Sequence, residues 1–182
     1  MAKKQWKLDK GLLVSVMNGD SEGAERFLRD GANPNQVVRA KNGTSPLLCQ
    51  AVCLTPDLLD LFIEKGAHVD VATLDGETPL HMAVEPEQVE RLLAAGASPT
   101  ARSACGETPL HVVLTREAAQ LLVDKGADPH AKCDQGLLPW QSLDLMASKM
   151  VATSTKVASR ADVEAAAKWL RSQVEGAALD DA

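Results

Sequence analysis

His130, Cys133 and Asp134 are close enough in the chain to suggest a metal site, because imidazole, thiolate and carboxylate groups are the usual zinc ligands. No second pair of ligands accompanies them in the sequence. The spacing therefore favours a surface histidine at position 130, and we expect neither a metal nor another cofactor.

The cysteines are the next candidates for chemistry. Cys49 and Cys53 lie four residues apart, on one face of an expected helix, and a reactive thiolate there would need a positively charged, partly exposed setting. Core packing explains this pair better. Cys105 is expected in a solvent-facing turn, but no histidine is placed to activate it. The cysteines form no C-x-x-C pair, which favours a reducing, cytoplasmic setting.

Glu77 and Glu107 recur at equivalent positions and could be imagined as a general acid and base. Equivalent residues of stacked helical repeats lie about 10 Å apart. The two carboxylates would then form an acidic row along the repeats. This row either binds a basic partner or is simply exposed to solvent. The sequence contains no phosphate-binding glycine loop, no H-E-x-x-H and no G-x-S-x-G motif. We expect no catalytic residues and no enzyme activity; chemistry in the divergent C-terminal part is the remaining alternative.

The charge pattern limits the possible partners. The net charge is −6, and the basic residues form no stripe except Lys3, Lys4 and Lys7, so we expect no nucleic-acid binding. No apolar run approaches the roughly 20 residues that span a bilayer, and no signal peptide is recognisable, so we expect no membrane association.

The elements that must position these residues are set by an internal repeat. The tetrapeptide Thr78-Pro79-Leu80-His81 recurs at 108–111, and each copy follows Gly-Glu. Glycines recur in the same frame, and prolines mark the expected helix starts. Between these marks the apolar residues have helical spacing, as in Val89, Leu92 and Leu93. Each unit therefore contains two short helices, the first capped by Thr78, Thr108 or Ser45.

These motifs resemble the ankyrin repeat, which carries T-P-L-H-x-A in a β-turn followed by two antiparallel helices. The resemblance covers about residues 8 to 145. It implies an all-α solenoid of about five units, whose first helices line a concave face and whose β-hairpin fingers project from one edge. It also implies that His81 and His111 are neutral imidazoles that brace adjacent units through loop backbone.

The repeat frame predicts one domain over residues 1–182. Its parts are an N-terminal cap at 8–40, repeats at 41–73, 74–103 and 104–133, a C-terminal cap at 134–176, and a frayed tail at 177–182. Trp140, Leu143 and Trp169 are expected to close the core of the second cap.

Two departures from the repeat distinguish this chain. The stretches Gly76–Gly96 and Gly106–Gly126 are shorter than Gly43–Gly66, so we expect their first helices to end about a turn early and the concave wall to be shallower. The first finger is longer, with exposed Val37 and Val38 and a basic tip. The added residues either have no functional effect or provide contacts to a partner.

The family resemblance places partner contacts at the finger tips and on the exposed side of the first helices. We call the corresponding residues the finger surface, and it mixes apolar with acidic side chains. The predicted members are Arg39, Lys41, Asn42, Thr44, Val52, Cys53, Leu74, Asp75, Glu77, Glu85, Ala104, Cys105, Glu107, Thr115, Asp134, Gln135 and Leu137.

We therefore expect a non-enzymatic protein-binding module, acting as an adaptor or scaffold. The alternative is a stand-alone inhibitor or immunity-type protein that blocks a partner enzyme. The expected partner is a protein with basic and apolar contact groups, and the chain on its own is expected to be a monomer.

Overall fold

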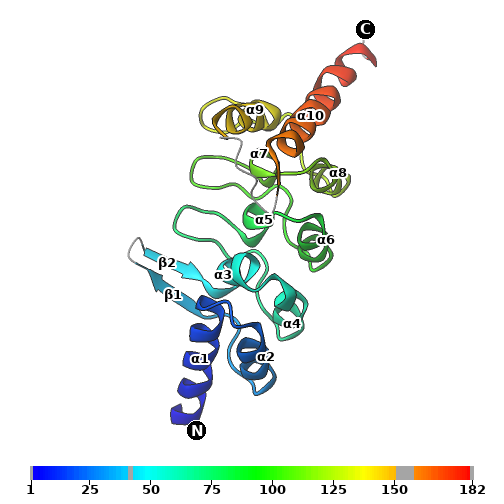
Figure 1. Ribbon diagram of the computed structural model, residues 1–182. Coiled ribbons are helices and arrows are strands. Elements are labelled where there is room, and N and C mark those ends of the chain that lie inside the picture. Colours follow the sequence, from blue (N-terminus) through cyan, green and yellow to red (C-terminus); the bar gives the residue numbers. More distant parts are fainter. Residues whose placement is uncertain (1, 41–42, 151–157, 181–182) are drawn as a thin grey trace. The chain divides into compact units, whose positions relative to one another are not determined.

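Helices dominate the computed structural model, which describes residues 2–40, 43–150 and 158–180, and a single two-stranded sheet accompanies them in those ranges (Figure 1). The chain forms two compact units, Met1–Met82 and Ala83–Ala182. The expected single domain over 1–182 stays a prediction.

Unit 1 contains the N-terminal cap, the first finger and the helices that follow it. Its elements in chain order are α1 (Ala2–Met17), α2 (Ser21–Arg29), β1 (Val37–Ala40), β2 (Gly43–Pro46), α3 (Leu47–Leu54), the 3-10 helix η1 (Pro56–Leu58), α4 (Leu59–Glu64) and α5 (Pro79–Met82).

The core of unit 1 begins where α1 packs against α2 and α3. Leu12 and Val16 of α1 and Leu28 of α2 are fully buried. The helices approach closely at Gly11, where a β-carbon would overlap the Phe27 ring. The cap thus begins at Ala2, earlier than the predicted residue 8, and uses a glycine to bring α2 close.

The first finger is an antiparallel β-hairpin, β1–β2, in which Val38 pairs with Ser45. Val37 is 58% exposed, as predicted, but Val38 is only 7% exposed. The prediction that both valines face solvent is therefore wrong, because side chains alternate between the two faces of a strand. The hairpin tip at 41–42 lies outside the described residues.

Unit 2 contains the short repeats and the C-terminal cap. Its elements are α6 (Pro86–Ala94), α7 (Pro109–Val112), α8 (Arg116–Asp124), α9 (Pro139–Lys149) and α10 (Arg160–Asp180). Helix α10 packs against α9 and α8, α6 packs against α8, and α7 packs against α9. Leu143 of α9 is fully buried, and Trp140 and Trp169 are half-buried, so all three contribute to the cap as expected.

Glycines end the second helices in one recurring way. Gly126 has a φ of 95°, and the following Ala127 N–H donates to the Leu122 carbonyl at 2.9 Å. This is the six-to-one bond of a Schellman cap, which satisfies a carbonyl that the helix leaves free. The same geometry occurs after α2, α4 and α6, so glycine fixes where each loop leaves its helix.

The first helices differ in length as the glycine spacing predicts. Helices α5 and α7 have four residues each, whereas α3 has eight. The missing residues come from the end of the first helix, and the chain turns directly into α6 or α8.

The C-terminal prediction is wrong at one point. Helix α10 continues to Asp180, so residues 177–180 are helical where a frayed tail is expected. Alanine and leucine at 177–179 favour continuation of a helix.

Candidate functional site

Each finger after the first closes with the same hydrogen-bonded turn. Thr73 N–H donates to the Glu77 carbonyl at 2.9 Å, and Gly76 N–H donates to the Thr73 carbonyl at 3.0 Å. Gly76 has a φ of 73°, which other residues rarely adopt. Ser103–Glu107 and Cys133–Leu137 repeat these two bonds. The turn leaves two residues at each tip, whose side chains are free to face solvent.

The tip residues are exposed in all three turns. Leu74 is 66% exposed, the largest fraction among the described large hydrophobic residues. The other exposed tip residues are Asp75, Ala104, Cys105, Asp134 and Gln135. Behind them Glu77, Glu107 and Leu137 are half-buried. In each turn, therefore, the tip residues are exposed and the residue behind them is partly covered.

In unit 2 the structure brings two tips together. Asp134 N–H donates to the Cys105 carbonyl at 3.0 Å, and the Arg102 guanidinium donates to the Lys132 carbonyl at 2.7 Å. Gly106 is buried against the Asp134 carboxylate, where a β-carbon would overlap it. Ala104, Cys105, Asp134 and Gln135 thus lie on one continuous patch.

The first finger and α3 contribute fewer residues than predicted. Arg39 and Thr44 are exposed, while Lys41 and Asn42 lie outside the described residues. Cys53 is exposed, but Val52 is only 1% exposed. Val52 lies one helical turn after Leu48 on the buried side of α3, so a partner cannot reach it, and its place on the finger surface is a wrong prediction.

Glu85 and Thr115 also occupy positions other than those predicted. Both are expected on first helices, but α5 ends at Met82 and α7 at Val112, so both residues precede second helices as N-caps. The Thr115 hydroxyl accepts from Ala118 N–H at 3.2 Å. Glu85 is exposed and Thr115 is half-buried. Both side chains take part in capping, Glu85 in a capping box with Gln88, and Glu85 is the more exposed of the two.

His111 joins its own helix to the next finger. Its Nδ1 accepts from Thr108 N–H at 3.0 Å and lies 2.9 Å from the Thr108 hydroxyl, while its Nε2 lies 3.2 Å from the Leu137 carbonyl. A carbonyl accepts only, so Nε2 carries the proton. Burial lowers the pKa of His111, which keeps the imidazole neutral; the bond to Leu137 opposes this shift. This is the brace that the family resemblance implies.

His81 makes the same local contacts in unit 1. Its Nδ1 lies 3.2 Å from Thr78 N–H and 2.9 Å from the Thr78 hydroxyl. Both imidazoles are buried. Thr78 and Thr108 therefore each contact a histidine side chain as well as accepting the first backbone bond of the helix.

The thiols beside the finger surface are poor nucleophiles. Burial, the neighbouring Cys53 and the Glu77 carboxylate raise the pKa of Cys49 to about 12. Desolvation and Glu77 also raise the pKa of Cys53, although this residue is exposed. Both thiols are protonated at neutral pH, so the site offers contact groups here and no thiolate.

Across residues 2–40, 43–150 and 158–180, no three His, Cys, Asp or Glu side chains converge as metal ligands would. None of the helices described is both long enough and apolar enough to cross a membrane.

Sequence reasoning missed two groups that position the fingers. The Asn35 side chain donates to the Gly66 carbonyl at 2.9 Å and accepts from His68 N–H at 2.8 Å, which ties together two successive loops of unit 1. Arg102 does the equivalent in unit 2. The contact of Asn35 had a signal in the sequence, which is Asn33-Pro34-Asn35 after a Gly-Ala ending. Asparagine side chains in such turns readily form hydrogen bonds that backbone groups would otherwise make.

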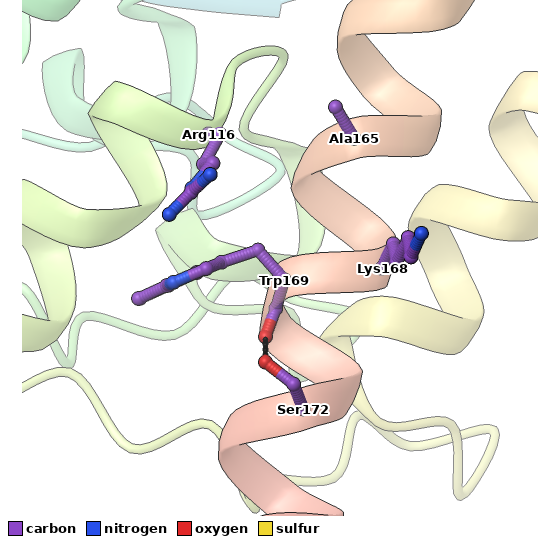
Figure 2. A pocket seen from close by; sticks show the side chains of 5 residues that line it. All are labelled: Arg116, Ala165, Lys168, Trp169 and Ser172. Carbon is purple, nitrogen blue, oxygen red and sulfur yellow. Dashed lines mark hydrogen bonds between the residues drawn. The ribbon is translucent and has the colours of Figure 1, made fainter.

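A separate depression lies between α8 and α10 in unit 2 (Figure 2). It has a volume of about 320 Å³ and is lined by Arg116, Ala165, Lys168, Trp169 and Ser172. Figure 2 shows the Arg116 and Trp169 side chains close together, and Lys168 directed away from them. None of the predicted finger-surface residues lines it.

Comparison with known families agrees with the repeat geometry. The family model for ankyrin repeats matches in three copies, over residues 12–103 and 55–133. No curated protein matches the chain. Ankyrin repeats are generally protein–protein interaction modules, and the family is typically non-enzymatic. Since the matched ranges together cover more than half of the sequence, and the helix pairs and fingers are present, the chain belongs to the ankyrin repeat family.

Proposed function

We propose that this chain is a non-enzymatic adaptor or scaffold that binds a partner protein through its finger surface. The observation that supports this proposal is the exposure of the tips. Leu74 is 66% exposed, although burying a leucine side chain is energetically favourable. The turn bonds of its finger are made by backbone groups and the Thr73 hydroxyl, and the Leu74 side chain takes no part in them. An exposed apolar anchor on a rigid turn suits an interface.

The charges around the anchor indicate the chemistry of the partner. In unit 1, Asp75 is exposed next to Leu74 at the tip and Glu77 is half-buried behind it; unit 2 repeats the pattern within itself, with Asp134 exposed and Glu107 half-buried. An apolar centre with an acidic rim favours a partner that presents lysine or arginine around an apolar residue. We place binding in the cytoplasm, where the exposed Cys53 and Cys105 remain reduced.

Substituting the anchor tests this proposal. Leu74→Arg should reduce capture of the partner from the protein's own cell lysate at least about tenfold, because it puts a like charge against a basic surface. The paired change Glu77→Lys with Glu107→Lys should weaken capture as well. Leu145→Arg is the matched control, because Leu145 is 44% exposed on α9 and makes no part of the finger surface.

The outcomes are distinguishable. Loss of capture in Leu74→Arg with cooperative unfolding retained, and normal capture by Leu145→Arg, supports the finger surface. Equal capture by both variants moves the interface elsewhere. The bound state then separates the two roles: an adaptor holds two partners at once, whereas an inhibitor lowers the activity of one captured enzyme at a one-to-one ratio.

A further inference from the structure

Helix α1 has a second apolar face that none of the described residues of unit 1 covers. Leu12 and Val16 are buried against the core, but Trp6 is 60% exposed, Val14 47% and Met17 43%. Residues 6, 14 and 17 lie on one side of a helix, opposite the buried side. These three account for much of the exposed large hydrophobic surface of unit 1 and lie outside the finger surface.

The same face is positively charged. Lys3, Lys7 and Lys10 are exposed there, and Lys10 lies over the Trp6 ring at 5.1 Å from its centroid. The acidic residue of α1, Asp9, turns away: its carboxylate accepts from Gln5 at 2.8 Å and from Asn33 N–H at 2.8 Å. The exposed face therefore offers ammonium and apolar groups with no compensating carboxylate.

This charge contrasts with the rest of the molecule. Helix α1 contains four lysines and one aspartate, a net charge of +3, whereas the whole chain has a net charge of −6. The remainder therefore carries −6 − (+3) = −9. A surface complementary to α1 is available on every other copy of this chain.

The best complement is a groove between α2 and the η1–α4 segment of unit 1, which Figure 1 shows side by side. Its volume is about 420 Å³, and its apolar floor is formed by Leu58 and Leu61. The Arg29 guanidinium in the groove is already paired with Glu25 at 2.7 Å. The acidic residues that line the groove are Glu22, Glu25, Asp57, Asp60 and Glu64.

We propose that the exposed face of α1 in one copy docks in the α2–α4 groove of a second copy. Lysines would meet the acidic rim, and Trp6 would meet the apolar floor. Since each copy carries both surfaces, two copies can exchange the contact reciprocally in a closed dimer. This inference replaces the monomer expected from the sequence, and it does not depend on the finger surface.

The placement of the charges favours a protein occupant over a lipid one. A helix that lies on a membrane needs a wide apolar face with the lysines on the opposite, polar side. In α1, Lys10 lies between Trp6 and Val14, so burying the apolar side chains in lipid would bury the ammonium group with them.

Analytical ultracentrifugation of the full chain tests the dimer. At low salt the sedimentation coefficient should rise with concentration, and added salt should reverse the rise, because the Debye length falls from about 30 Å at 0.01 M to about 10 Å at 0.1 M. A chain that stays monomeric across the whole concentration range at low salt overturns the proposal. Monomer together with binding to phosphatidylserine vesicles also overturns it and assigns α1 to lipid.

Charge reversal identifies the two surfaces. Lys7→Glu with Lys10→Glu on α1, or Asp57→Lys with Glu64→Lys in the groove, should each weaken self-association at least about tenfold. An equimolar mixture of these two variants should dimerise again, because each restores opposite charge to the other. Lys125→Glu with Lys132→Glu is the matched control, since both lysines are exposed in unit 2 and the charge change is equal.

The mixture decides between this contact and a general effect of net charge. Recovery of the dimer in the mixture, with the control variant unchanged, supports the assigned pair of surfaces. Loss of the dimer in both single variants without recovery in the mixture overturns the pairing. Circular dichroism melts of every variant establish that the fold is retained, as expected for substitutions at exposed positions.

Discussion

The repeats predicted at 41–73 and 104–133 hold their first helices, α3 and α7, in different ways. Helix α3 has eight residues, no side-chain bond at its N-cap, and five buried residues among the eight. Helix α7 has four residues and depends on Thr108, His111 and the Leu137 carbonyl. A single helical turn is not stable on its own, because the entropy cost of nucleating a helix exceeds the stabilisation from the hydrogen bonds of one turn. Helix α7 also buries Pro109, Leu110 and His111, so where this chain shortens the helix, side-chain bonds add to the packing.

The two repeats also differ at the histidine position. His111 of α7 corresponds to Leu48 of α3, and both are buried. Leu48 contributes apolar contact, whereas His111 contributes three polar contacts and ties the helix to the next finger. The short repeat therefore couples helix and finger, and the longer repeat does not need that coupling.

Removing the imidazole should have the largest effect. His111→Leu leaves the buried Thr108 N–H without its partner and removes one of the two bonds to the Leu137 carbonyl, which keeps its bond from Cys133 N–H. The change should lower the free energy of unfolding by about 2–3 kcal/mol. Leu48→Met, a volume-conserving change at the equivalent position, should cost less than about 1.5 kcal/mol. Urea unfolding of both variants measures the difference. Equal costs would mean that the imidazole is only a space-filling group.

Removing single hydroxyls should have a smaller effect. Thr108→Val deletes the hydroxyl bonded to His111 while keeping the side-chain shape, and should cost about 1 kcal/mol. Ser45→Ala, just before α3, should cost less than about 0.5 kcal/mol, because the half-buried Ser45 hydroxyl makes only a 3.1 Å bond from Gln50 and a long 3.5 Å bond to the Pro46 carbonyl. Thermal and urea unfolding of the pair provide the test. A larger cost at Ser45 would contradict the contrast between the two repeats.

The smallest expected effect is a dependence of the free energy of unfolding on pH, caused by His111. Burial lowers the pKa of His111 below its ordinary value of 6.5 in the folded state. As the pH falls through 6.5 the unfolded chain takes up a proton before the folded chain does, so the free energy of unfolding should decrease. Above 6.5 this contribution is fully present. Comparing wild type with His111→Leu from neutral to mildly acidic pH isolates it, and parallel curves for the two proteins would show that His111 does not titrate as described.

The repeat frame was predictable because glycine, proline and Thr-Pro-Leu-His each fix a local geometry. Helix starts at Pro79 and Pro109 and the short lengths of α5 and α7 follow from these marks. The tips were predictable for the same reason, since a glycine at Gly76 defines which two residues precede it. Packing was harder to predict: Val52 is adjacent to the exposed Cys53, and only the angle at which α3 meets its neighbours decides which is buried.

Long-range polar contacts were also beyond the sequence. Asn35 and Arg102 bond to residues about thirty positions away; the local sequence around Asn35 indicates a side chain that bonds to backbone, but it does not identify the distant partner. The apolar face of α1 was not predicted, because the prediction for this segment rested on its basic residues and not on the exposure of Trp6, Val14 and Met17.

The native cysteines allow the most direct test of the finger surface. Cys105 is exposed at a tip, whereas Cys49 and Cys133 are buried and serve as internal controls in the same molecule. Maleimide labelling followed by mass spectrometry should show Cys105 modified at least about tenfold more slowly when the captured partner saturates the chain, since interfaces exclude solvent. Unchanged labelling of Cys105 in the complex would contradict partner binding at these tips.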